Sequence, residues 1–180
     1  MKRLALFLTM ILAVPAAAQQ AASSSSSSGV GAAKGMWQQM TSYLTAASEQ
    51  MPEKDYAFRP THDVRTFGEM IGHVAGAQRM ICAAALGEKP TAEDAIEKTV
   101  TTKAGLVAAL KASTQYCDRA YAQTDAASAA PISLFGMSMT RMGALVLNAT
   151  HNSEHYGNLV TYMRIRGMVP PSSQPTPPRG

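Results

Sequence analysis

The clearest helical pattern of the chain lies in residues 149–167, A-T-H-N-S-E-H-Y-G-N-L-V-T-Y-M-R-I-R-G. Its apolar residues recur at helical spacing, and the pattern extends back to about Ser138. Gly167 and then Pro170 are signals that end a helix. We therefore predict one long helix over about 138–166.

Two of the four histidines of the chain, His151 and His155, lie within this helix and are four residues apart. That spacing places both rings on one face. The other members of the face are apolar: Leu147, Leu159 and Tyr162. The pair is either a chance pair on a solvated face or two thirds of a metal site, and rings that point into an apolar core need polar partners.

Three more helices are predicted upstream, at about 34–51, 66–87 and 102–123. The second has the clearest boundaries, because Thr66-x-x-Glu69 is a capping box and Gly87 suits the C-terminal end. No segment alternates polar and apolar residues for long enough to predict a strand. The fold class is therefore all-α, a four-helix bundle.

The second predicted helix supplies a third histidine. His73 shares its face with Met70, Ala77 and Met80, and that face points toward the core. Three neutral imidazoles with open positions would match a catalytic metal site. The alternative is three buried histidines that are hydrogen-bonded to Glu69, Glu154 or nearby hydroxyl groups. His62 lies in a polar stretch, and we expect it to be solvated or to cap a helix.

The N-terminus has the pattern of a secretory signal. Lys2 and Arg3 precede an apolar run, and Ala16-Ala17-Ala18 predicts cleavage after Ala18. The alternative is an uncleaved anchor, but the apolar run is shorter than the roughly 20 residues that span a bilayer. We therefore expect a periplasmic or secreted protein, and no membrane contact once residues 1–18 are removed.

The remaining chain divides by composition. Residues 19–35 are rich in Ala, Ser and Gly and are predicted to be a disordered linker. Residues 36–173 are the predicted bundle, and residues 174–180 form a proline-rich tail.

Without Lys2 and Arg3, the 16 basic side chains fall to 14 against 12 acidic ones, a net charge of +2. The basic residues are scattered, so a nucleic-acid partner is not expected.

Several segments of the chain form a motif set with a specific order and spacing. The segments are Phe58-Arg59-Pro60, Thr66-Phe67-Gly68-Glu69-Met70-Ile71-Gly72-His73, Lys103-Ala104-Gly105-Leu106-Val107-Ala108-Ala109-Leu110, and His151-x-x-x-His155-Tyr156-Gly157-Asn158-Leu159, followed by Tyr162, Arg164, Gly167, Pro170 and Pro171. Together they resemble the DinB-like family of proposed metalloenzymes, and the resemblance covers nearly all of residues 37–173.

The resemblance implies an up-down-down-up bundle with a divalent metal ion bound by His73, His151 and His155. Zinc is the first expectation and nickel the rival, because imidazole suits both. Some members of the family resemble thiol S-transferases. We expect an exported metal-dependent hydrolase or thiol-transferase-like enzyme that acts on an unidentified small molecule. The alternative is a non-catalytic metal-binding bundle in stress response or a binding module; a homodimer stays open.

Other residues near the histidine pair have weaker assignments. Glu154 points about 100° away from His155 on the helix, so it is a weak candidate for a general base. Tyr156, Asn158 and Arg164 are assigned either to the surroundings of the metal or to the structure of the bundle.

The connection over residues 87–101 is long enough to return along a whole helix, which favours parallel second and third helices. Parallel helices would bring Cys82 and Cys117 to the same level. A disulfide and two small buried thiols both remain open.

Overall fold

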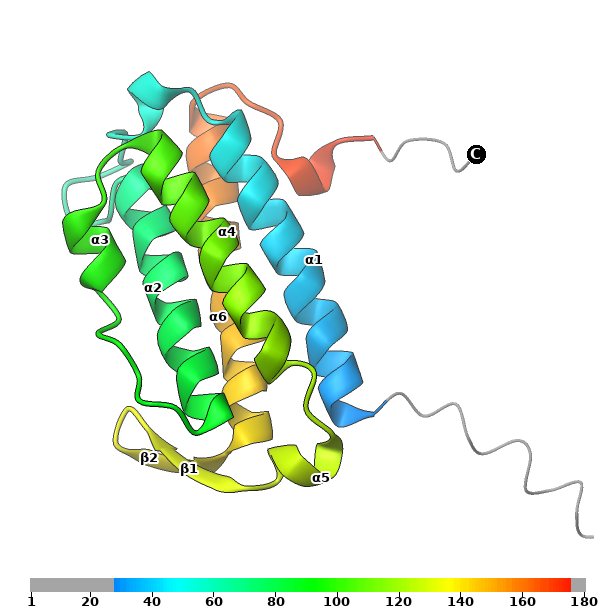
Figure 1. Ribbon diagram of the computed structural model, residues 1–180. Helices are drawn as coiled ribbons and strands as arrows, with labels where there is room; N and C mark the ends of the chain where they lie inside the picture. The colour runs from blue at the N-terminus through cyan, green and yellow to red at the C-terminus, as the bar shows by residue number, and fades with distance from the viewer. Residues whose placement is uncertain (1–27, 176–180) are drawn as a thin grey trace, which may run out of the picture.

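The computed structural model describes residues 28–175 and consists of a bundle of long helices. Figure 1 shows α1 and α6 running upward and α2 and α4 running downward, which confirms the predicted up-down-down-up bundle. The predicted signal peptide, residues 1–18, lies outside the described residues. The four long helices are α1 (Gly29–Gln50), α2 (Phe67–Leu86), α4 (Lys103–Ala120) and α6 (Arg141–Ile165).

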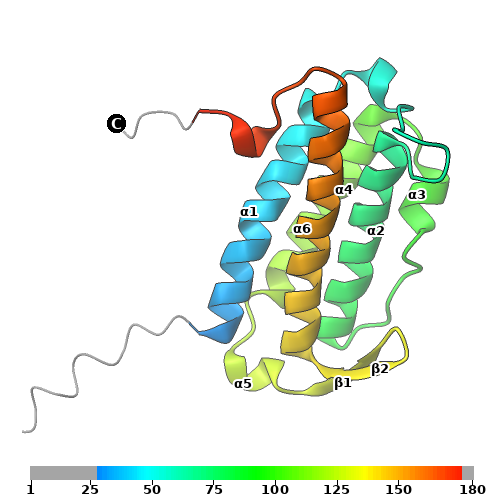
Figure 2. The ribbon, with the colours of Figure 1, turned by 180° about the vertical axis from the view of Figure 1, so that it is seen from behind.

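Shorter elements lie between the long helices and after the last of them. The two strands pair antiparallel, and Figure 2 shows their hairpin and α5 at the end of the bundle where α6 begins. The short elements are η2 (Glu53–Asp55), α3 (Ala95–Thr99), α5 (Asp125–Ser128), β1 (Pro131–Leu134), β2 (Met137–Thr140) and η3 (Pro171–Ser173).

The ends of α2 are those expected from sequence. The Thr66 hydroxyl accepts a hydrogen bond from the Glu69 N–H, and the Glu69 carboxylate accepts one from the Thr66 N–H. Gly87 ends the helix in the left-handed region with a φ of 75°, where a side chain would be strained. These caps fix the register of the helix that carries His73.

The prediction of a disordered linker over residues 19–35 is wrong for its second half, because α1 already begins at Gly29. The Asp125 carboxylate accepts hydrogen bonds from the N–H groups of Gly29 and Val30, each at 2.9 Å. Val30 and Ala33 are buried against the bundle. Contacts distant in sequence therefore order a segment whose composition favours disorder. Residues 19–27 lie outside the described range.

A second correction concerns the predicted start of the last helix at Ser138. Residues 131–140 form a β-hairpin, and α6 begins at Arg141, where the Thr140 hydroxyl accepts a hydrogen bond from the Gly143 N–H. The turn places Phe135 and Gly136 at φ 53° and 74°. Strands of four residues are too short for alternation to be recognised in the sequence.

The centre of the bundle contains a buried polar network that joins all four long helices. Gln78 of α2 accepts hydrogen bonds from Trp37 of α1 at 2.8 Å and from Asn152 of α6 at 2.9 Å. Its amide nitrogen donates to the Ser113 hydroxyl of α4 at 3.0 Å. A buried amide must be satisfied in this way, so the network specifies how the four helices meet.

The connection between α2 and α4 passes through α3 and returns along the bundle, so α2 and α4 run parallel (Figure 1). Cys82 and Cys117 lie level on these helices and are joined by a disulfide, with a Cα–Cα distance of 5.4 Å. The parallel arrangement predicted from the length of the connection is thus present. Within residues 28–175, no helix is both long and apolar enough to cross a bilayer.

Candidate metal centre

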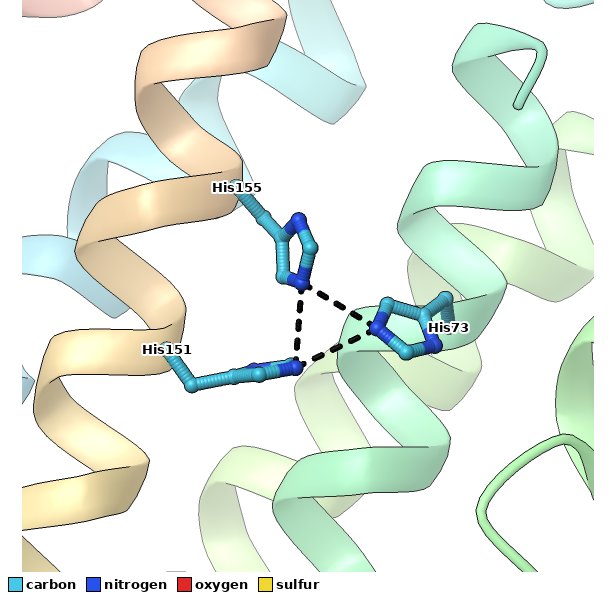
Figure 3. Close-up of side chains that lie close together, drawn as sticks. All are labelled: His73, His151 and His155. Carbon is cyan, nitrogen blue, oxygen red and sulfur yellow. Dashed lines mark hydrogen bonds between the residues drawn. The ribbon is translucent and has the colours of Figure 1, made fainter. Parts of the chain in front are cut away.

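Three histidine rings converge between α2 and α6. The Nε2 atom of His73 lies 3.1 Å from that of His155 and 3.2 Å from that of His151, and the Nε2 atoms of His151 and His155 are 3.0 Å apart. Figure 3 shows the three nitrogen atoms pointing toward one another from the two helices. The spacing of one helical turn on α6 and one inward position on α2 produces this triangle.

Hydrogen bonds among the rings cannot satisfy all three nitrogen atoms. The Nε2 atom of a neutral imidazole carries either one hydrogen or one lone pair, so it takes part in a single hydrogen bond. Among the three contacts, therefore, only one can be a hydrogen bond at a time. One cation bound at about 2.0–2.1 Å, as zinc is by histidine, would satisfy three lone pairs together. This group of histidines could hold a metal ion.

The three rings are neutral near pH 7. Burial is the main cause that lowers each pKa to about 4. For His73 the next cause is the positive charge of Arg65, and for His151 and His155 it is a neighbouring histidine of the group. Neutral imidazole is the form that binds metals.

The Nδ1 atoms face away from the shared point. The Nδ1 atom of His73 is buried without a hydrogen-bond partner, and carboxylate oxygens of Glu93 and Glu97 each lie 3.8 Å from it. The Nδ1 atom of His155 lies 3.5 Å from the side-chain amide of Asn158. Because the two ends of such an amide are assigned rather than observed, the Asn158 oxygen can accept from this ring.

The alternative hydrogen-bonded histidines suggested by sequence are not found among residues 28–175. The Glu69 carboxylate caps α2, Glu154 is exposed, and no hydrogen bond joins the three rings to either residue or to a hydroxyl group. His62 is solvated as expected, with a side chain that is 97% exposed.

The other candidate residues of α6 fall into two groups, one beside the histidines and one that contacts the C-terminal segment. Asn158 lies beside His155. Tyr156 accepts a hydrogen bond from the Ser172 N–H, and Arg164 donates to the Ser173 hydroxyl. The latter two therefore attach the C-terminal segment to the bundle.

Sequence reasoning missed Arg65, Glu93 and Glu97 as neighbours of the site. Arg65 donates from Nε to Glu97 at 2.9 Å, and its backbone carbonyl accepts a hydrogen bond from the Tyr162 hydroxyl. These residues lie in loops and in the short helix α3, so no periodic pattern relates them to the histidines.

Comparisons with known proteins agree with the fold. The sequence-family model of the DinB superfamily matches residues 36–159. A DinB-like protein from Bacillus cereus has a TM-score of 0.64 at 18% identity, over 75% of this chain and 91% of that one. A DinB-like protein from Bacillus subtilis has a TM-score of 0.62 at 20% identity, over 79% and 97%. No curated protein has significant sequence similarity to the chain.

Proposed function

The chain belongs to the DinB superfamily, and we propose that it is an exported metal-dependent enzyme with one divalent ion bound by His73, His151 and His155. The observation that carries the proposal is the convergence of three Nε2 atoms within 3.0–3.2 Å of one another. Zinc is the first candidate and nickel the second, since imidazole nitrogen suits both.

A bound ion would supply Lewis acidity and would lower the pKa of a water or thiol that reaches it. The chain itself contributes three neutral rings held on two rigid helices, two of which, His73 and His155, are 7% and 8% exposed. Burial limits water around the rings, and the helices keep their separation fixed. Such a donor set, with three protein ligands, is typical of catalytic zinc rather than closed structural zinc.

Hydrolysis is the reaction class we favour over thiol transfer. The Cys82–Cys117 disulfide supports an oxidising compartment. A low-molecular-weight thiol would also tend to be oxidised there, whereas water is always available as the second substrate. The substrate is proposed to be a small molecule, because the three rings lie between α2 and α6 (Figure 3) and two of them, His73 and His155, are buried.

The proposal is tested by turnover with metal-stripped and metal-loaded protein. Zinc-loaded and nickel-loaded samples are offered small esters, amides and phosphoesters, and separately an electrophile with a thiol. We expect hydrolysis that requires the ion and is lost in His151→Ala, but kept in His62→Ala. Metal binding without turnover on any substrate class would instead favour the non-catalytic metal-binding bundle.

Export is a separate part of the proposal, supported by the residue pattern of positions 1–18 and by the disulfide. Residues 1–30 fused to a reporter that is active only outside the cytoplasm should give signal. Mass spectrometry of the native protein should find an N-terminus near Gln19. Full-length protein recovered from the cytosolic fraction would contradict export.

A further inference from the structure

Two glycines on α2 allow the connection before α4 to lie directly against the helix beside His73. A Cβ atom built at Gly72 would lie 2.8 Å from the Glu97 Cα atom, and one at Gly76 would lie 1.9 Å from the Glu93 carbonyl oxygen. Real Cβ atoms do not approach backbone so closely, so any side chain at either position would displace residues 93–97. Both glycines are therefore required for this contact.

This close contact places two carboxylates beside Nδ1 of the His73 ring, the nitrogen that faces away from the other two histidines. Oxygens of Glu93 and Glu97 each lie 3.8 Å from Nδ1, the buried nitrogen that has no hydrogen-bond partner. A charge-assisted hydrogen bond is about 2.7–2.9 Å long, so a shift of roughly 1 Å in one carboxylate oxygen would form it.

Glu97 is better placed than Glu93 for this role. Its second oxygen accepts a hydrogen bond from Arg65 Nε at 2.9 Å, so one end of the carboxylate is already fixed. Arg65 is held in turn by the Tyr162 hydroxyl of α6, the helix that carries the other two histidines. The Glu97 side chain is 17% exposed, against 35% for Glu93. The Glu97 carboxylate is thus connected through Arg65 to α6 and lies beside His73 of α2.

We propose that Glu97 is a positioning residue for the metal centre, which accepts a hydrogen bond from the Nδ1–H of His73. A neutral imidazole has one N–H, so a proton held on Nδ1 leaves the Nε2 lone pair free to bind an ion. The carboxylate selects this tautomer and fixes the direction of the ring, as carboxylates do behind metal-bound histidines. This inference rests on the metal site proposed above.

The test compares Glu97→Gln with two control variants in the full-length mature protein. Glu93→Gln removes the other nearby carboxylate. Glu88→Gln removes a glutamate that also pairs with an arginine, Arg119 at 2.8 Å, but does not contact the histidines. Zinc dissociation constants are measured by competition with a chromophoric chelator. The tautomer of His73 is measured in metal-free protein from its ring ¹⁵N chemical shifts.

We expect Glu97→Gln to weaken zinc binding by about tenfold or more, and to reduce the fraction of His73 protonated on Nδ1. Glu93→Gln should have a smaller effect, and Glu88→Gln none. Equal zinc affinity in Glu97→Gln and Glu88→Gln, or an unchanged tautomer, would overturn the proposal. A larger effect in Glu93→Gln would also overturn it.

Absence of the metal site and absence of the Glu97 role give different results in this experiment. If the wild-type protein binds no zinc or nickel, the proposed metal site is wrong. The tautomer of His73 in metal-free protein still decides whether Glu97 acts on the ring. If Glu97→Gln only destabilised the fold, it would lower the unfolding temperature without changing the tautomer of His73. A change of tautomer therefore distinguishes a positioning role of Glu97 from a structural one.

Discussion

Alanine at His73, His151 or His155 is expected to abolish the high-affinity binding of a divalent ion. Each change removes one of three nitrogen atoms that lie 3.0–3.2 Å apart. Loss of a residue that only hydrogen-bonds to a metal ligand typically weakens metal binding by about 10–100-fold. Loss of a ligand itself should therefore raise the dissociation constant by about a hundredfold or more. Chelator competition measures the dissociation constant directly.

In thermal unfolding, a hundredfold excess of zinc over its dissociation constant should stabilise the wild-type protein by about 2.7 kcal/mol. The variants should show no comparable increase.

His62→Ala is the matched control for these variants. Its side chain is 97% exposed and lies outside the histidine group, so the variant should bind the ion as the wild-type protein does. Equal affinity in all four variants would contradict the assignment of the site.

Loss of the Cys82–Cys117 disulfide should produce the largest change in stability. The bond joins residues separated by 35 positions. In the chain-entropy model, opening a loop of this length costs about 3 to 4 kcal/mol. We expect Cys82→Ala/Cys117→Ala to lower the free energy of unfolding by this amount, as measured by urea denaturation without reductant.

Reduced wild-type protein is the control for that double variant. With dithiothreitol present, its unfolding midpoint should fall close to that of the variant, because both lack the cross-link. Two free thiols per chain, titrated in denatured and unreduced protein, would contradict the bridge. Oxidised and reduced proteins with unfolding free energies within about 1 kcal/mol would contradict the stabilising role.

The sequence predicted those parts of the fold that rest on local patterns. The capping box of Thr66 and Glu69 and the glycine end signal at Gly87 correctly placed α2. The i, i+4 spacing of His151 and His155 correctly placed both rings on one face of α6 (Figure 3). These patterns depend on a few neighbouring residues, so they can be recognised without tertiary contacts.

The missed features depend on contacts between distant residues. The start of α1 is ordered by Asp125, which lies about 95 residues further along the chain. The hairpin at residues 131–140 is too short to give a periodic signal. Glu97 reaches His73 only because Gly72 lacks a side chain. None of these features follows from the spacing of residues in one segment.

X-ray absorption at the zinc edge of the loaded mature protein tests whether the three histidines bind the ion. We expect one zinc ion per chain, with scattering from three imidazole rings at about 2.0–2.1 Å and at least one further light ligand. His155→Ala should reduce the fitted number of rings. A spectrum with no imidazole scattering, or with sulfur ligands in its place, would contradict a metal centre built from His73, His151 and His155.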